Sequence, residues 1–178
     1  MNECIEIIKK RRSTRSFQAS MPPAALVREV VEAGLYAPCS MDSESTRIIV
    51  ITDKDLRQKL SELNCSLGYW KKGFDPFYGA PVIILVVADK DDVNHVYNGS
   101  VQLMTMMLAA ESLGLQTCWV HRAKEEMEKP LGQEILSRAG IFFRPGQFAG
   151  IGHLAIGYGA EEPAPPAPRK EGRISYIS

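Results

Sequence analysis

The densest group of residues able to do chemistry lies near the N-terminus, in the sequence Arg11-Arg12-Ser13-Thr14-Arg15. Guanidinium groups bind phosphate through paired, charge-assisted hydrogen bonds, and a hydroxyl adds a further donor. The alternative is a solvated basic face at the C-terminal end of a helix, where the helix dipole favours cations. The residues alone leave both interpretations open.

Other chemical signatures are weak. Residues 150–155, Gly-Ile-Gly-His-Leu-Ala, imitate the dinucleotide fingerprint G-x-G-x-x-G/A, but strand-like sequence follows where the fingerprint needs a helix. His95, His121 and His153 lack the spacing of zinc ligands, and Cys39 is expected to be structural rather than nucleophilic. We therefore expect no amino-acid nucleophile, and an enzyme without one can take its chemistry from a cofactor.

Composition excludes several classes of partner. The 21 Lys and Arg residues balance 21 Asp and Glu residues, whereas nucleic-acid-binding proteins usually carry a basic excess. The longest apolar run, Ala80 to Ala88, is less than half of the roughly 20 residues that span a membrane. The N-terminus lacks a signal-peptide pattern, and the four cysteines are too scattered for a disulfide framework. We expect a cytoplasmic protein of one domain, residues 1–178, with no nucleic-acid or membrane partner.

Hydrophobic periodicity predicts helices mixed with strands. Helices are expected over residues 3–12, 22–37, 53–63 and 95–113, and from 123 onward with an interruption or restart at Pro130. Strands are expected over residues 47–52, 81–88, 116–121 and 153–158, and residues 13–17 should be extended. Because helices and strands do not alternate strictly, we predict an α+β fold around one sheet.

Three segments have no clear period. Residues 38–46 are polar and loop-like, and residues 64–79 form a long stretch rich in glycine and aromatic residues, typical of a functional or mobile loop. The tail, residues 160–178, begins rich in proline and ends in Arg173 to Ile177, which has the composition of a strand. A tail of this kind invites pairing with another chain.

Six motifs in order along the chain resemble those of the nitroreductase family. They are Arg11–Phe17, Ala37–Asp42, Asp75–Pro81, Ala109–Leu115, Trp119–Glu125 and Pro168–Glu171. The resemblance implies a nitroreductase-like α+β fold, with a central, mostly antiparallel sheet flanked by helices. It also implies a homodimer with swapped terminal segments, in which residues 160–178 embrace the partner subunit and FMN lies at the interface. NADH or NADPH would donate hydride and leave, and a small acceptor such as a nitro compound or quinone would take its place.

The resemblance also assigns the phosphate end of the cofactor site. Arg11, Ser13 and Arg15 would hold the FMN phosphate, and Arg169 near the C-terminus would assist them. Arg12 would contact the pyrimidine side of the flavin.

The ring would be held by two other segments. A loop from the other subunit would pack on it, formed by Pro38, Cys39, Ser40, Met41 and Asp42. Val120, His121 and Arg122 would present backbone groups to the N5 edge and O4, where charge develops on reduction. No side chain would act as acid or base, because the flavin carries the chemistry.

Two acids depart from the family pattern. Asp42 and Glu44 stand where the family usually has Asn and Gln, and an acid near the flavin would oppose its anionic reduced form and lower its potential. This departure favours one rival function, a non-catalytic FMN store or redox sensor. The other rival is a flavin-free protein that binds a phosphorylated ligand through the arginine cluster.

Overall fold

The computed structural model describes residues 2–177, in which four strands form one sheet. Its strands lie in the order β1 (Thr46–Ile51), β2 (Val82–Asp89), β4 (Phe148–Gly157) and β3 (Gln116–Val120). All neighbouring pairs are antiparallel. The predicted α+β fold with an antiparallel sheet is confirmed.

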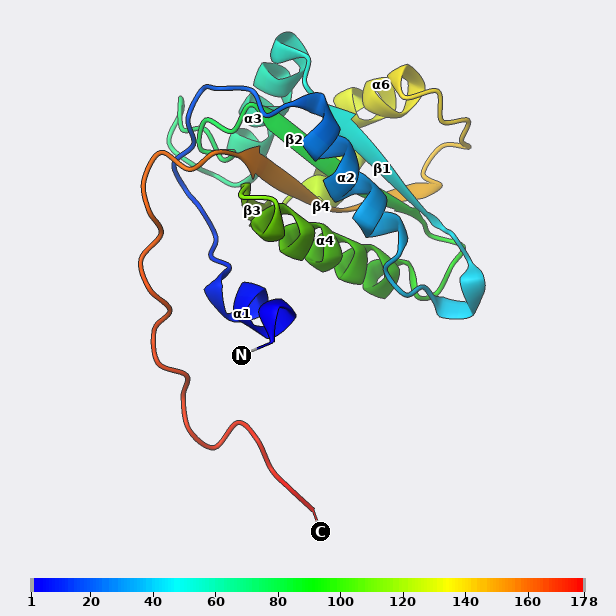
Figure 1. Cartoon of the computed structure of the whole chain (residues 1–178). Coiled ribbons are helices and arrows are strands. Elements are labelled where there is room, and N and C mark those ends of the chain that lie inside the picture. The colour runs from blue at the N-terminus through cyan, green and yellow to red at the C-terminus, as the bar shows by residue number, and fades with distance from the viewer. Residues whose placement is uncertain (1, 178) are drawn as a thin grey trace.

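Helices cover both faces of this sheet (Figure 1). On one face lie α2 (Ala24–Leu35) and α4 (His95–Ser112); on the other lie α3 (Lys54–Leu67), α5 (Ala123–Met127) and α6 (Pro130–Arg138). Pro130 begins α6, since the first turn of a helix does not need its missing N–H. The predicted restart at this proline is confirmed.

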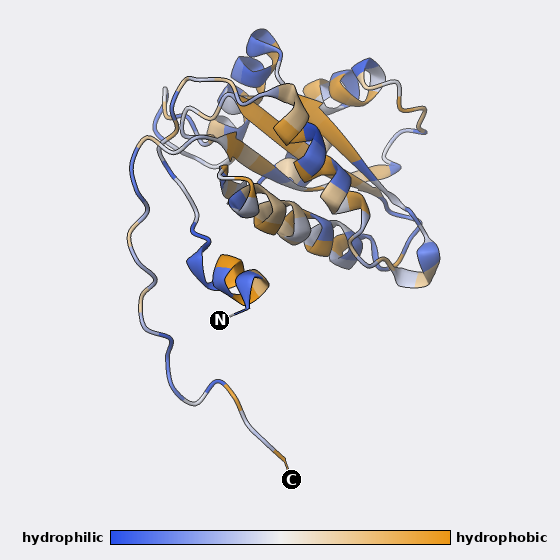
Figure 2. Ribbon diagram, in the orientation of Figure 1, coloured by the Kyte–Doolittle hydropathy of each residue, from blue (hydrophilic) through white to orange (hydrophobic). Residues whose placement is uncertain are grey.

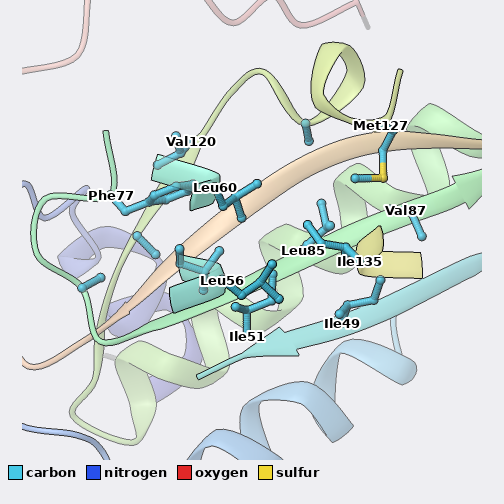
Figure 3. Packing of buried hydrophobic residues seen from close by; sticks show 14 of the residues in the cluster. Ile49, Ile51, Leu56, Leu60, Phe77, Leu85, Val87, Val120, Met127 and Ile135 are labelled. Carbon is cyan, nitrogen blue, oxygen red and sulfur yellow. The ribbon is translucent and has the colours of Figure 1, made fainter. Parts of the chain in front are cut away.

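The central strand β2 supplies both halves of the core. Its residues alternate between the faces, as the strand period of two requires. Val82, Ile84 and Val86 pack with α2 and α4, whereas Ile83, Leu85 and Val87 pack on the opposite face. Figure 2 shows the apolar residues concentrated in the sheet. Figure 3 shows the core on the face of Ile83, Leu85 and Val87, to which α3, α5 and α6 contribute Leu56, Leu60, Met127 and Ile135.

Strand β4 begins at Phe148, earlier than the predicted start at residue 153. Gly150 and Gly152 lower the strand propensity of its first half, and each position needs a glycine because another residue packs closely against it. A Cβ on Gly150 would lie 2.2 Å from the carbonyl oxygen of Ala123, and one on Gly152 would lie 2.4 Å from Nε1 of Trp119. The glycines therefore serve packing within a strand rather than a dinucleotide-binding turn.

The two ends of the chain lie away from this body (Figure 1). Helix α1 (Glu3–Lys10) buries none of its residues, and its Lys10 Nζ lies 3.9 Å from Oε1 of Glu111 at the end of α4. Beyond Ala160 the tail is extended and exposed, and residues 173–177 join no strand within residues 2–177. Pairing of this segment with another chain stays a prediction. None of the described helices has the length and apolar character that crossing a membrane demands.

Candidate functional site

The extended segment after α1 sets the directions of the arginine side chains. Its backbone bonds to the sheet: the Thr14 N–H donates to the carbonyl of Thr117 at 3.0 Å. Thr14 is buried and its Oγ1 lies 3.2 Å from Oε1 of Gln116, whereas Ser13 and Arg15 are exposed on the opposite side. This alternation is the strand period of two, and it holds from Ser13 to Arg15 but not on to residue 17, because Ser16 is exposed and Phe17 is buried. The prediction of an extended segment over residues 13–17 is confirmed.

Ser13 and Arg15 open into a hollow of about 580 Å³, here called the arginine hollow. Its lining residues are Arg11 to Ser16, Glu161 to Ala167 and Arg169. The structure thus brings Arg169 to the N-terminal cluster from the far end of the sequence. Four arginines face two glutamates in the lining, so its charge favours an anion.

Arg11 is the residue best prepared for a ligand in this hollow. Its Nη1 is buried and has no hydrogen-bond partner among the described residues. Buried donors are almost always paired in folded proteins, so an unpaired one indicates a missing partner. In residues 2–177, Arg11, Arg15 and Arg169 form no ion pair with a carboxylate.

Arg12 also lines the hollow and has a buried, unpaired Nε, but its two terminal nitrogens face the end of α1. Its Nη2 donates to the carbonyl of Lys9 at 2.7 Å and its Nη1 to the carbonyl of Arg11. These contacts satisfy backbone acceptors at the end of α1, where cations are also favoured by the helix dipole. The helix-end interpretation therefore describes Arg12, and its contact with a flavin stays a prediction.

A second pocket of about 430 Å³ adjoins the hollow, and Arg15 lines both. We call it the aromatic pocket; its other lining residues are Asn64, Gly68, Trp70, Phe74, Pro76, Tyr78, Trp119, Val120, His121 and Arg122. The ring centroids of Trp70 and Phe74 lie 5.1 Å apart, and those of Phe74 and Tyr78 lie 5.9 Å apart. The long segment between α3 and β2 therefore forms one wall of the pocket, although its sequence identified no single residue.

The aromatic wall is anchored by Asp75. This carboxylate accepts hydrogen bonds from Ser61 Oγ at 2.7 Å and from the N–H groups of Phe77 at 3.0 Å and Gly79 at 2.8 Å, and it pairs with Arg57. Burial alone would raise the pKa of Asp75, but the hydrogen bonds outweigh it and lower the pKa. The wall is therefore held most firmly when Asp75 is ionised.

Val120, His121 and Arg122 lie together in the aromatic pocket, where β3 ends and α5 begins. Arg122 has a φ of 79°, in the left-handed region that residues other than glycine seldom adopt. Its Nη1 lies 2.9 Å from Oε1 of Glu125, and this hydrogen bond lowers the pKa of Glu125. The three residues thus line one pocket, and their contacts with a flavin stay predictions.

The loop over residues 38–46 is held elsewhere, by Asn98 in the first turn of α4 and by Asp92 just before that helix. Ser40 N–H donates to Oδ1 of Asn98 at 3.0 Å, and Asp92 accepts from the hydroxyls of Ser43 and Ser45 at 2.7 Å each. The hydroxyl bonds, with the backbone N–H of Asn94, hold the pKa of Asp92 at about 2. Within this polar segment, Ser40–Asp42 form the short 3-10 helix η1.

This position separates the loop from the arginine hollow of the same chain. The loop is bonded to Asn98, whereas α1 approaches Glu111, 13 residues further along α4. That separation corresponds to roughly 20 Å along a helix. Residues 38–42 therefore do not join the arginines within one subunit, and their role at a neighbouring subunit's site stays a prediction.

One buried polar group behind the pocket was missed. Nε2 of His153 lies 2.8 Å from Oε2 of Glu126, and both side chains are 0% exposed. His153 was considered as a metal ligand and as a partner of Cys39, and neither interpretation indicated this pair. The available signal was a lone acid on the inner face of α5 and a lone histidine in the otherwise apolar end of β4.

Comparison with known proteins identifies the family of the chain. The profile of the nitroreductase family matches residues 8–136. The chain belongs to the nitroreductase family. Such a nitroreductase of Bacteroides fragilis, solved with bound FMN, superposes with a TM-score of 0.88 at 25% identity over 100% of both chains.

Two curated relatives carry enzyme names. A Methanothermobacter thermautotrophicus protein assigned as an NADH dehydrogenase/NAD(P)H nitroreductase is 27% identical over 165 residues, which cover 90% of this chain and 80% of that protein. An FMN reductase [NAD(P)H] of Bacillus subtilis is 29% identical over 140 residues, covering 66% of this chain and 53% of that protein. The resemblance to nitroreductases inferred from the six motifs is confirmed.

Proposed function

We propose that the chain binds FMN, with the phosphate in the arginine hollow and the ring in the aromatic pocket. The observation that carries this proposal is that Arg15 lines both spaces. One molecule with an anionic end and a planar aromatic end can therefore occupy both. Arg11, Ser13 and Arg169 would bind the phosphate with Arg15, and the buried, unpaired Nη1 of Arg11 fits that task.

The proposed activity is oxidoreduction between a nicotinamide nucleotide and a small acceptor. When bound, FMN supplies the redox chemistry, so no nucleophilic side chain is needed. The aromatic wall would exclude water and stack on flat rings, and the turn at Arg122 would offer a backbone N–H to the ring. NADH or NADPH and the acceptor, such as a nitro compound or quinone, would use the same open pocket in turn. The names of the relatives support this class of reaction.

We also propose that the active form is a homodimer of the chain, residues 1–178. Apolar side chains are exposed along α1, at Ile5 and Ile8, and along α4, at Tyr97, Val101 and Met104. Such surfaces are typical of contacts between subunits. In the dimer, residues 38–42 of one subunit would reach the flavin of the other, and the tail 160–178 would embrace the partner.

The deciding experiment is the visible absorption spectrum of the purified protein before and after anaerobic addition of NADH or NADPH. We expect flavin bands that bleach promptly. Flavin bands that persist would instead identify a non-catalytic FMN store or sensor. Absence of flavin even after incubation with FMN would leave the arginine hollow as a site for another phosphorylated ligand. Sedimentation analysis of the same sample tests the dimer.

A further inference from the structure

Behind the aromatic pocket, three polar side chains from three elements form one buried network. Oε1 of Glu126, on α5, accepts a hydrogen bond from Nδ2 of Asn64, on α3, at 2.6 Å. Oε2 of the same carboxyl lies 2.8 Å from Nε2 of His153, on β4. Asn64 is 2% exposed, and Glu126 and His153 are 0% exposed. None of the three touches the arginine hollow.

Close packing also holds α5 in place. The helix already packs without free space: a Cβ on Gly132 would lie 2.5 Å from the carbonyl of Glu126, and one on Gly150 would meet Ala123. Burying charged or polar partners is costly, and well-packed apolar residues often stabilise a fold as well or better. The network therefore points to a task other than stability.

The second hydrogen of the Asn64 amide connects the network to the aromatic pocket. Nδ2 also donates to the carbonyl oxygen of His121 at 2.7 Å, in the turn that lines the aromatic pocket. The carboxylate of Glu126 fixes the rotation of the Asn64 amide, and the amide fixes the carbonyl of His121. Because a trans peptide is planar, the N–H of Arg122 must then point to the opposite side. Within residues 2–177 this N–H donates no hydrogen bond.

We infer that Glu126 and His153 are positioning residues that act through Asn64 to fix the peptide between His121 and Arg122. The inference rests on the proposed function, because the fixed N–H gains its purpose from a flavin in the pocket. A preoriented donor stabilises charge that develops on reduction without reorganisation at that moment. Nε2 of His153 lies against the second oxygen of Glu126 without the alignment of a hydrogen bond, so its ring limits the space into which the carboxylate can turn away from Asn64.

Loss of the network should consequently weaken binding of reduced FMN more than binding of oxidised FMN. We expect a selective weakening of about tenfold, which lowers the two-electron midpoint potential by about 30 mV. In the FMN-free protein, amide hydrogen exchange across residues 119–123 should accelerate by at least about tenfold, because the turn gains local openings.

The experiment compares four variants. Glu126→Met combined with His153→Leu replaces the polar pair by apolar residues of similar size and leaves Asn64 in place. Asn64→Ala removes the hydrogen bonds to the His121 carbonyl and to Glu126, together with a side chain that lines the aromatic pocket. Glu126→Gln retains an oxygen facing Asn64 and should stay close to wild type. Ile84→Val, in the core on the other face of β2, is the control for general loss of stability.

Each variant is measured for hydrogen exchange without FMN, for FMN affinity and for midpoint potential. Faster exchange and a lower potential in the double variant and in Asn64→Ala, but not in Glu126→Gln or Ile84→Val, support the inference. If the double variant and Asn64→Ala have the same hydrogen-exchange rates and midpoint potential as Ile84→Val, the inference is overturned. If the double variant does not fold, Asn64→Ala decides. Failure of the wild type to bind FMN would refute the proposed function, whereas hydrogen exchange would still decide whether the network holds the turn.

Discussion

Removal of one arginine from the hollow gives the sharpest test of the phosphate assignment. Arg11 and Arg15 line the hollow, and within the described chain neither is paired with a carboxylate. Replacing either by Ala removes a charged donor from the ligand while breaking no ion pair of the protein. The FMN-free variants should therefore unfold at the same temperature as wild type, or slightly higher because repulsion among the arginines falls.

The expected loss of affinity follows from the bonds removed. A hydrogen bond to a charged group contributes about 1.5–3 kcal/mol. Each Arg→Ala variant should therefore bind FMN about 10- to 150-fold more weakly. A lysine at the same position keeps the charge but lacks the planar fork, so Arg→Lys variants should fall between wild type and Ala.

Titration with FMN and with riboflavin, followed by quenching of flavin fluorescence, isolates the phosphate. Riboflavin has the same ring and no phosphate, so its affinity should be the same for wild type and for Arg11→Ala. Arg138→Ala is the matched control, because Arg138 is half-exposed and pairs with Asp53 and Glu134. Equal losses for both flavins, or an unchanged affinity for FMN, would refute a phosphate site in the arginine hollow.

Three further predictions concern the supports of the site. Gly150→Ala should destabilise the fold by about 1–3 kcal/mol in denaturant unfolding, because its Cβ would lie 2.2 Å from a backbone oxygen; an unchanged midpoint would contradict this packing. Asp75→Ala should cost about 2 kcal/mol and speed proteolysis within residues 69–74, whereas a wall that stays resistant would exclude the anchoring role. The pKa of Asp92 falls from 3.8 to about 2 on folding, so the ionised carboxylate contributes its full stabilisation above pH 4, and this stabilisation is lost as pH falls toward 2. Asp92→Asn should therefore lose less stability than wild type between about pH 4 and pH 2, and identical stability profiles for the two proteins would contradict this role of Asp92.

Local sequence signals predicted most of the fold. The proline at the start of α6 and the apolar run of β2 each specified an element that the structure contains. The alternation predicted for residues 13–17 holds from Ser13 to Arg15, and bridges at Ser13 and Phe17 tie the segment to the fold. These signals act within a few residues, through dihedral preferences and periodic burial. The beginning of β4 was lost because Gly150 and Gly152 weaken strand propensity, and the reason for them lies in residues more than 25 positions away.

The candidate site was predictable only in part for the same reason. Motif order identified the arginines, and the structure gathers Arg11, Arg15 and Arg169 in one hollow. The bond between Glu126 and Asn64 joins residues 62 positions apart. No period or spacing in one sequence reveals such a pair, because only the packing of α3, α5 and β4 brings its members together. The aromatic wall, in contrast, was indicated as a functional loop without its individual residues.

The tail lines the proposed phosphate site and is also the segment proposed to contact the partner subunit, which links FMN binding to dimerisation. Residues 161–167 and Arg169 form a wall of the arginine hollow, and the same tail is the segment proposed to embrace a second subunit. If FMN and the second subunit both bind to this segment, each must change the affinity of the other by the same factor, since coupling free energies are reciprocal. Dilution that separates subunits should then release FMN, and scarcity of FMN should favour separated subunits. The oligomeric state of the chain would in this way depend on the supply of FMN.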